Sequence, residues 1–462
     1  MSTLQSSATP QLECLHRGKV RDSYRIDPKT RLIVATDRLS AFDRVLETGI
    51  PGKGAVLTRL AAFWFERTRG IVENHMHRVI GSRAMLVREA QPILIEMVVR
   101  GYLTGSSWRK YREGVRTISG VPLPEGLSKN DRFSTPILTP TTKDVHDTEI
   151  SPDEIVARGL IDWPTYEKMA SLSLQLFEEG TAHLASHGIL LVDTKYEFGL
   201  VDGALVLIDE IHTPDSSRFW AAEEYAADAG CVEACDKEFV RGWLLKEQAT
   251  GRDPVALPAE IVEETTRRYR EICERITETA LPPIPRNPRS ELIEELVAAG
   301  LVKDGVVGIV MGSPSDRAHA EKIAKIIRSY DIAVRLHVAS AHKTPEAVAA
   351  LASAYSAACE PCALVAVAGL SNGLGGALAA NATVPVINCP PFKNDADFLA
   401  NINSSLMMPS KTPAATTVRP DNAALAALRG LNIGRLRDRF ADEIELSRAG
   451  IAAADLELRE TP

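Results

Sequence analysis

The chain has 462 residues, of which 45% are hydrophobic and 25% charged, and its formal net charge is −8 at pH 7. This length exceeds what one hydrophobic core serves, so we expect two or more domains of ordinary globular composition. The excess of acidic groups argues against a nucleic-acid or anionic-membrane partner, and no apolar run approaches the roughly 20 residues of a membrane-spanning helix.

The N-terminal residues and the cysteines indicate a cytoplasmic protein. The first residues lack the basic and apolar regions of a signal peptide, and we expect residues 1–11 to form a disordered tail. The seven cysteines are scattered and odd in number, which is typical of reduced thiols in the cytoplasm.

Short apolar segments separated by turns over residues 12–35 predict three antiparallel strands. The first turn carries Gly18, Lys19 and Arg21. A glycine lets the backbone approach a phosphate, and the basic side chains add positive charge, so this turn is a candidate phosphate site. Surface hairpins often carry the same residues, which is the plainer alternative. Asp37 follows in a polar loop.

An apolar strand is expected over residues 92–99, and a segment rich in glycine and hydroxyl groups follows it. Arg100 begins this segment and can hold an anion through two parallel hydrogen bonds. Ser106 lies near its end, where it either binds an anion or caps the next helix. A second hydroxyl-rich segment, residues 136–143, ends on Lys143. These three side chains are candidate ligand-binding groups.

The spacing of apolar residues predicts helices over residues 57–65, 163–187 and 258–279. Ser151 and Glu154 form a capping box, with a proline at the first helical position, and predict the start of a further helix.

Residues 189–220 hold two apolar strands that meet at Asp202-Gly203 and carry the carboxylates Asp193, Glu197, Asp209 and Glu210. Buried carboxylates are costly unless they are paired or bind a cation, and Mg²⁺ binds one or two carboxylates together with nucleotide phosphates. A two-residue loop would place Glu197 and Asp209 on opposite faces, whereas a three-residue loop with Gly203 in the left-handed region would place them on one face. We predict the three-residue loop, because a shared metal requires it; a solvated hairpin face is the alternative.

Six segments, in this order and spacing, resemble SAICAR (phosphoribosylaminoimidazole-succinocarboxamide) synthetase: GKVRDSY, ATDRLSAFD, VVRGYLTGSSW, TPTTK, VDTKYEFG and DEIHTPDSSRFW. The resemblance covers roughly residues 12–279 and implies an α+β domain with antiparallel sheets. It implies that ATP activates the carboxylate of CAIR, a carboxylated aminoimidazole ribonucleotide, for attack by the amine of L-aspartate. The residues that it implies are Gly18, Lys19 and Arg21 for ATP; Glu197 and Asp209 for Mg²⁺; Arg100, Ser106 and Arg218 for CAIR; and Asp37 and Lys143 beside the reacting groups.

Four prolines among residues 281–290 remove backbone donors and fix φ, so neither a helix nor a central strand runs through this segment. We interpret residues 281–305 as a Pro-rich linker and a helix that join a domain over residues 12–280 to a second domain over residues 306–462. In the second domain apolar strands alternate with helices, which predicts an α/β fold with a parallel sheet between two layers of helices.

Three polar clusters of the second domain each follow an apolar strand, and ligands of parallel sheets bind at the carboxyl ends of the strands. Each cluster also has a plainer interpretation as a helix cap or a glycine turn. Their coincidence at three strands favours a phosphate or nucleotide site. The candidate residues are Gly312, Ser313, Ser315 and Asp316; Ser340, His342 and Lys343; and Ser371, Asn372 and Gly373.

The segments MGSPSD, SAHKTP and AGLSNGLGG resemble AIR (aminoimidazole ribonucleotide) carboxylase over roughly residues 306–431. Residues 371–373 are similar to the branch that adds CO₂ directly without ATP, although Leu370 stands where arginine is expected in that branch. The resemblance implies proton transfer by His342, a CO₂ pocket at residues 371–373, and AIR at the other two clusters. A mutase acting on an N-carboxylated isomer and a non-catalytic oligomerisation module are the alternatives.

Together the two resemblances imply a bifunctional enzyme of purine biosynthesis, whose second domain makes the CAIR that its first domain consumes. They imply ATP and Mg²⁺ as cofactors, with AIR, CO₂, CAIR and L-aspartate as substrates. Residues beyond 422 read as helices rich in alanine, leucine and arginine, and we expect a homo-oligomer assembled through the carboxylase domain.

Overall fold

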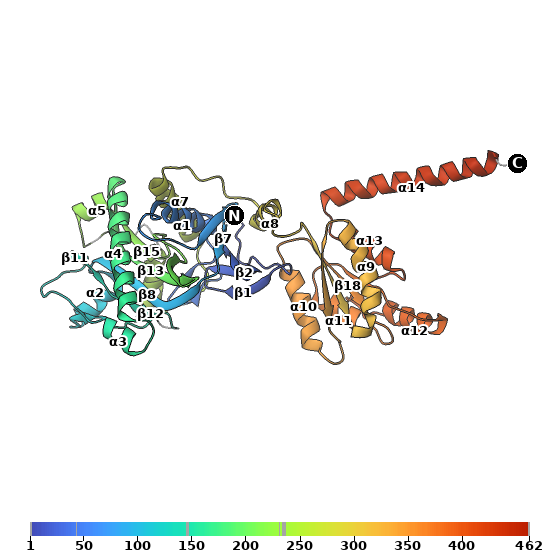
Figure 1. Ribbon diagram of the computed structural model, residues 1–462, viewed down its shortest axis with the longest axis horizontal. Coiled ribbons are helices and arrows are strands. Elements are labelled where there is room, and N and C mark those ends of the chain that lie inside the picture. The colour runs from blue at the N-terminus through green and yellow to red at the C-terminus, as the bar shows by residue number, and fades with distance from the viewer. Residues whose placement is uncertain (1, 43, 145–146, 231, 233–236, 461–462) are drawn as a thin grey trace. The chain divides into compact units, whose positions relative to one another are not determined.

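The computed structural model describes residues 2–42, 44–144, 147–230, 232 and 237–460. The chain divides into two compact units (Figure 1): unit 1 comprises Met1–Gln5 and Cys14–Pro288, and unit 2 comprises Ser6–Glu13 and Arg289–Pro462. No helix within the described ranges is long and apolar enough to cross a membrane. The cysteines of the described ranges are free thiols, as expected, while Cys231 and Cys235 lie outside those ranges.

Unit 1 is built on antiparallel sheets, as the sequence predicts. The first sheet has the order β1-β2-β3-β7-β6, and the second has the order β11-β8-β13-β14, with β12 paired to β8 and β15 paired to β13. The meander predicted over residues 12–35 is confirmed as β1 to β3, and the strand predicted over residues 92–99 lies within β8. The strands of unit 1 are β1 (Glu13–Arg17), β2 (Arg21–Asp27), β3 (Thr30–Ala35), β4 (Ser40–Ala41), β5 (Arg44–Val45), β6 (Met76–Ile80), β7 (Ala84–Arg88), β8 (Gln91–Tyr102), β9 (Thr117–Ile118), β10 (Val121–Pro122), β11 (Arg132–Leu138), β12 (Thr141–Thr142), β13 (Ile189–Val201), β14 (Ala204–Ile208) and β15 (Ser217–Ala221).

The three helices predicted in unit 1 from apolar spacing are confirmed as α1, α4 and α7. The capping box is also confirmed, because the Ser151 hydroxyl accepts a hydrogen bond from the Glu154 amide and the Glu154 carboxylate accepts one from the Ser151 amide. The helices of unit 1 are α1 (Lys53–Arg67), α2 (Gly105–Arg112), α3 (Pro152–Ala157), α4 (Trp163–Ser186), α5 (Ala222–Ala227), α6 (Glu238–Ala249) and α7 (Ala259–Thr277).

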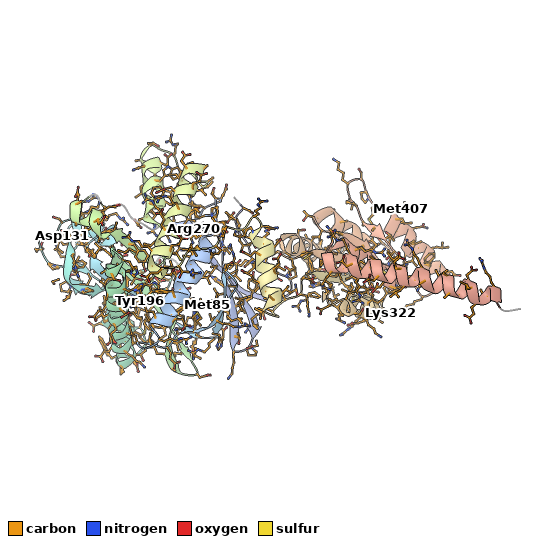
Figure 2. All side chains as sticks on the ribbon, turned by 90° about the horizontal axis from the view of Figure 1, so that it is seen from above. Met85, Asp131, Tyr196, Arg270, Lys322 and Met407 are labelled. Atoms are coloured by element: carbon orange, nitrogen blue, oxygen red, sulfur yellow. The ribbon has the colours of Figure 1, made fainter. Side chains whose placement is uncertain are left out.

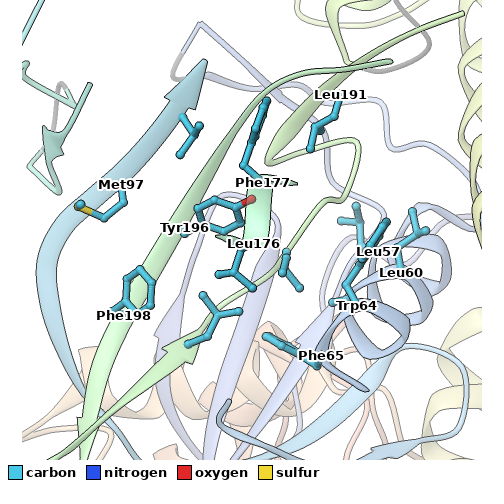
Figure 3. Packing of buried hydrophobic residues seen from close by; sticks show 14 of the residues in the cluster. Leu57, Leu60, Trp64, Phe65, Met97, Leu176, Phe177, Leu191, Tyr196 and Phe198 are labelled. Carbon is cyan, nitrogen blue, oxygen red and sulfur yellow. The ribbon is translucent and has the colours of Figure 1, made fainter. Parts of the chain in front are cut away.

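The main core of unit 1 lies between the second sheet and the helices α1 and α4. Tyr196 and Phe198 point from β13 into this core, where they meet Trp64 of α1 and Phe177 of α4 (Figure 3). Burying a side chain of this size contributes about 1.5–3 kcal/mol to folding. Since side chains alternate along a strand, the odd-numbered residues of β13 near Tyr196 point to the opposite face of the sheet. That face carries the candidate site described below.

Unit 2 has the predicted α/β fold. Its parallel sheet has the order β17-β16-β18-β19-β20. Val307 and Ile309 of β16 pack with α9 and α13 on one face, and Val306 and Val310 pack with α10 and α11 on the other, so β18 in Figure 1 lies between two helical layers. The elements of unit 2 are α8 (Pro288–Ala298), β16 (Val306–Met311), η1 (Pro314–Asp316), α9 (Arg317–Ser329), β17 (Ala333–Val338), α10 (Pro345–Ala357), β18 (Cys362–Val367), α11 (Gly373–Asn381), β19 (Val386–Asn388), α12 (Asp395–Leu406), β20 (Ala415–Thr416), α13 (Pro420–Gly430) and α14 (Gly434–Glu460).

The disordered tail expected over residues 1–11 is wrong for the residues described there. Leu4 is fully buried, and its amide and carbonyl both bond to Asp37 in unit 1. Ala8 and Gln11 are also buried, and they bond to residues of unit 2. Composition alone failed here because the segment has few apolar residues and is ordered mainly by hydrogen bonds to partners distant in the sequence.

Candidate active sites

The outer face of β13 carries a row of charged side chains. Asp193, Lys195 and Glu197 alternate along the strand and therefore share this face. On the neighbouring strand β8, Arg100 lies opposite Asp193, and Glu96 lies opposite Glu197. Charged groups on a partly buried sheet are costly unless they are paired, and those described here are paired. We call this row the polar face of unit 1.

One end of the polar face is a cluster of carboxylates and lysines. Lys143 forms an ion pair with Glu197, and the Lys195 ammonium lies 2.5 Å from a Glu96 oxygen and 3.4 Å from a Glu197 oxygen. Burial and the neighbouring Asp209 raise the pKa of Glu197 to about 7, although Lys195 and Lys143 oppose the shift. Glu197 therefore holds a proton far more readily than an ordinary carboxylate.

The hairpin that carries Glu197 and Asp209 differs from the predicted one. The hairpin has a two-residue loop, Asp202-Gly203, and pairs Glu197 with Ile208, so the predicted three-residue loop is wrong. Asp202 and Gly203 have φ values of 49° and 81°, which suit the tight turn that matches the strand twist. Asp209 follows the last paired residue with φ of 65°, so the alternation of the strand does not determine where its side chain points.

Arg21 holds Asp209 in place. Its guanidinium lies 2.5 Å from Asp209 and also forms an ion pair with Glu210. Burial raises the pKa of Asp209, but Arg21, Lys143 and Lys195 outweigh it and keep that pKa below its usual range. The structure thus gives Arg21 two carboxylate partners, whereas the sequence assigned it to ATP.

The turn that carries Gly18 and Lys19 is fixed by its backbone. The Arg38 guanidinium donates to the carbonyl oxygen of Gly18 at 2.9 Å and to that of Lys19 at 3.3 Å, and it pairs with Asp22 at 2.7 Å. The Lys19 side chain is exposed. The turn therefore presents a lysine on a rigid backbone.

The other end of the polar face collects positive charge. Arg218 lies 2.6 Å from Asp193, and Arg100 lies 3.5 Å from the same carboxylate oxygen. A Cβ at Gly105 would lie only 2.7 Å from an Arg218 nitrogen, so the guanidinium packs directly on the start of α2. Ser106 is the next residue of that helix and is exposed. Two arginines and a helix N-terminus are groups that favour an anion.

Asp37 is buried, and its carboxylate is bound by groups of unit 1. Its carboxylate is fully buried and accepts hydrogen bonds from the amides of Leu4 and Gly54, at 2.8 and 3.0 Å, and from Arg83 at 3.1 Å. These partners account for both carboxylate oxygens. The structure therefore does not bring Asp37 to the polar face as an open group.

Two charged residues of unit 1 were missed in the sequence, whereas Asp193 was noted there as a strand carboxylate without an assigned role. Lys195 could have been found from its alternation with Asp193 and Glu197, since the three positions are two residues apart. No comparable pattern in the sequence indicates Lys237. It precedes α6, and burial lowers its pKa although Asp215 opposes the shift; among the described residues it forms no hydrogen bond or ion pair.

The three polar clusters of unit 2 meet at the carboxyl edge of the sheet, because they follow the adjacent parallel strands β17, β16 and β18. The loop after β16 is ordered by Ser313, whose hydroxyl accepts hydrogen bonds from the Ser315 amide at 3.3 Å and the Ser315 hydroxyl at 2.8 Å. Burial raises the pKa of Asp316 in the same loop. Gly312 packs closely on Ala368, which joins this loop to the one after β18.

His342 lies against the loop after β18. A Cβ at Gly373 would lie 3.2 Å from the imidazole Nε2. Ser340 orders the histidine's own loop by accepting from the Lys343 amide at 3.3 Å. The imidazole and Lys343 are exposed, and among the described residues His342 has no hydrogen-bond partner. Its ring is therefore available to a ligand.

A cavity of about 530 Å³ is lined by Ser371, Asn372 and Gly373 together with Met407 of the segment after α12. The Asn372 side chain accepts from the Gly375 amide at 3.1 Å and donates to the Ser405 hydroxyl at 2.8 Å, so it caps α11 and ties the loop to α12. Ser371 is exposed. Leu370 has φ of 59° and is 78% exposed, which leaves it in contact with solvent.

Two family models match the chain. The model described as SAICAR synthetase matches residues 14–256, and the model described as AIR carboxylase matches residues 306–448. The first match contains the polar face of unit 1, and the second contains the three loops of unit 2.

Individual proteins match each unit. The phosphoribosylaminoimidazole-succinocarboxamide synthase of Azobacteroides pseudotrichonymphae is 45% identical over 270 residues, which span 57% of this chain and 84% of that protein. The solved SAICAR-synthase from Saccharomyces cerevisiae complexed with SAICAR is 34% identical, covers 61% of this chain and 100% of its own, and has a TM-score of 0.55. The solved PurE of Treponema denticola is 35% identical and covers 34% of this chain and 99% of its own, with a TM-score of 0.32.

Proposed function

Since this chain belongs to the SAICAR synthetase family through residues 14–256 and carries an AIR carboxylase domain at residues 306–448, we propose that it catalyses two consecutive steps of purine biosynthesis. Unit 2 carboxylates AIR to CAIR, and unit 1 joins CAIR to L-aspartate with ATP. The proposal rests on the polar face of unit 1, which has Arg100 and Arg218 at one end and at the other end Glu197, whose pKa Asp209 helps to raise.

CAIR binds along β13. Arg100, Arg218 and the start of α2 hold its phosphate, since two guanidinium groups and a helix N-terminus favour a dianion. Asp193 and Glu197 are four residues apart, or about 13 Å along an extended strand, which an extended ribonucleotide can bridge. Lys195 lies between them and holds the carboxylate of the substrate.

Mg²⁺ and ATP bind at the other end. Glu197 and Asp209 fit a magnesium ion, because both are carboxylates at this end of the polar face and the charge of Asp209 adds to burial in raising the pKa of Glu197. The described residues hold no group of three or more histidine, cysteine or acidic side chains that could hold a metal ion, so Glu197 and Asp209 would hold Mg²⁺ together with the nucleotide. Bound Mg²⁺ neutralises charge on the transferred phosphoryl group. Lys19 adds positive charge at the phosphates from its fixed turn.

The ligation proceeds in two displacements. A carboxylate oxygen of CAIR attacks the terminal phosphorus of ATP, forming an acyl phosphate and releasing ADP. The amine of L-aspartate then attacks the acyl carbon, the carbon–oxygen bond to phosphate breaks, and the amide of SAICAR forms with loss of one amine proton. Lys143 and Lys195 keep the reacting oxygens charged and oriented. Phosphoryl transfer depends mainly on such positioning and charge stabilisation.

Lys237 binds a carboxylate of L-aspartate. It is a half-buried ammonium that forms no hydrogen bond or ion pair among the described residues, and a bound carboxylate would add a direct counter-charge. Lys53 does not compete for this role, because Asp215 already holds it at 2.6 Å.

In unit 2 the electron-rich ring carbon of AIR attacks CO₂, forming a carbon–carbon bond, and His342 accepts the proton that this carbon loses. The ribonucleotide binds at the loops around Ser313 and Ser340, and CO₂ binds beside Gly373, against which the imidazole lies. Direct carboxylation is favoured over a mutase because residues 371–373 read Ser-Asn-Gly, without the second histidine of the rearranging branch.

Copies of the chain assemble through unit 2. Apolar side chains there are open to solvent: Met407, labelled in Figure 2, is 81% exposed, and Leu406 and Ile451 are 63% and 70% exposed. Sedimentation analysis should give a mass that is a multiple of the chain mass.

The experiment that tests the unit 2 assignment supplies the purified protein with AIR and labelled bicarbonate, or with the N-carboxylated isomer, and omits ATP. We expect label in CAIR from the first mixture. Conversion of the isomer alone would identify a mutase.

A further inference from the structure

Residues 6–13, which we call the N-terminal strap, belong to unit 2, although the residues on both sides of them belong to unit 1. Ala8, Thr9 and Gln11 of the strap are 4%, 8% and 7% exposed. Such burial in a segment with no helix of its own means that unit 2 provides a surface for it.

The side chains of the strap bind two features of that surface. The Gln11 amide group donates to the Lys303 carbonyl at 2.9 Å and accepts from the Lys303 amide at 2.7 Å. The Gln11 nitrogen also lies 3.1 Å from a Glu360 oxygen, and the Thr9 hydroxyl donates to the same oxygen at 2.5 Å. Glu360 is 4% exposed, so these bonds form away from water.

The backbone of the strap is held as well. The Cys359 amide donates to the Ala8 carbonyl at 2.8 Å, and the Arg335 guanidinium donates to the carbonyls of Pro10 and Gln11. A surface that satisfies both backbone carbonyls and side chains of a peptide is specific to its sequence.

We propose that unit 2 carries a binding surface for the N-terminal strap, formed by Glu360, Arg335 and the backbone of Lys303, and that this contact is a second tie between the two catalytic units besides the linker. The strap is continuous with Leu4, which is anchored on Asp37 of unit 1, and with β1, which leads to the turn that carries Lys19. The tie is thus attached to unit 1 on both sides.

The test cuts the linker in the intact protein. A recognition sequence for a site-specific protease is inserted after the exposed Arg286, and the cleaved protein is passed over a gel-filtration column at pH 8. We expect the two fragments to elute together, because the strap of the first fragment remains bound to the second.

The variant Gln11→Glu places a carboxylate beside buried Glu360, and we expect its cleaved fragments to separate, with a dissociation constant raised about tenfold or more. Adding Glu360→Gln to that variant removes the repulsion and should restore part of the association. Gln175→Glu makes the same change on the exposed face of α4 and should leave the fragments together. Circular dichroism of each uncut variant checks folding. Separation of the cleaved unsubstituted protein, or joint elution of the cleaved Gln11→Glu variant, would overturn the proposal.

Discussion

The charge of Asp209 contributes to raising the pKa of Glu197, although the register of the hairpin, continued by one residue, places Asp209 opposite Tyr196 of the apolar face. The strand pairing ends at Ile208, and Asp209 has a φ of 65°, so the alternation of the strand no longer fixes the direction of its side chain. Arg21 holds that side chain in place. The proposed ligation needs Asp209 together with Glu197.

Glu197→Gln should impair the synthetase reaction and leave the carboxylase reaction intact. The amide keeps the shape of the side chain but removes the charge that faces a divalent cation, so we expect the apparent affinity for Mg²⁺ to fall at least about 10- to 100-fold. Isothermal titration with Mg²⁺ and a nonhydrolysable ATP analogue measures this. Glu178→Gln, on the exposed face of α4, is the matched control and should behave as the unsubstituted protein.

The affinity for Mg²⁺ should depend on pH in the range set by Glu197. Its pKa is raised to about 7, so protons occupy the carboxylate below that pH and compete with the metal. We expect the affinity to fall by up to about tenfold for each pH unit below 7 and to level off above it. A titration series from pH 6 to pH 8.5 checks this. A flat profile in the unsubstituted protein, or the same inflection in Glu197→Gln, would contradict the assignment.

Gly105→Ala should weaken the binding of CAIR. The new methyl group would lie 2.7 Å from an Arg218 nitrogen and must displace the guanidinium from the start of α2. Loss of one charged hydrogen bond to phosphate corresponds to an increase in KM for CAIR of about tenfold or more. Gly114→Ala is the control, since Gly114 also has a positive φ but nothing lies within 4 Å of its Cβ position. Equal effects of the two changes would mean that backbone strain, and not Arg218, is responsible.

Lys237→Gln should raise the KM for L-aspartate and leave the KM for CAIR unchanged. The substitution removes the half-buried ammonium that forms no hydrogen bond or ion pair among the described residues. Lys246→Gln, at an exposed position of α6, tests the loss of charge alone. Steady-state kinetics with each substrate varied in turn would reject the role if CAIR were the substrate affected.

His342→Asn should abolish CAIR formation without changing the ligation of added CAIR. Removal of a proton-transfer group typically costs 10²- to 10⁴-fold in rate. The synthetase activity of the same preparation is the internal control, because His342 belongs to unit 2. Carboxylation at the normal rate would leave the histidine without a catalytic role.

Local patterns in the sequence predicted the elements well, because each depends on neighbouring residues. The capping box at Ser151 and the helical spacing of α1, α4 and α7 are examples. The position of the three polar clusters of unit 2 was also predictable from local patterns, since the strands of a parallel sheet end at one edge.

The wrong predictions concern contacts that a local sequence pattern does not reveal. We predicted the register of the hairpin from the requirement that Glu197 and Asp209 share a metal. The residues Asp202-Gly203 instead favour a two-residue turn, which is the loop that the structure has. The partners of Asp37 and of the N-terminal strap lie far away in the sequence, so neither the buried position of Asp37 nor the order of the strap could be read from composition.

The most direct test of the two-step assignment follows one preparation of the intact protein through both reactions. AIR and bicarbonate are supplied first, without ATP or L-aspartate, and Mg²⁺, ATP and L-aspartate are then added while the products are separated by chromatography. We expect CAIR in the first stage and its conversion to SAICAR, with one ADP for each SAICAR, in the second. No CAIR in the first stage would contradict direct carboxylation by unit 2, and CAIR that persists after the addition would contradict the ligation by unit 1.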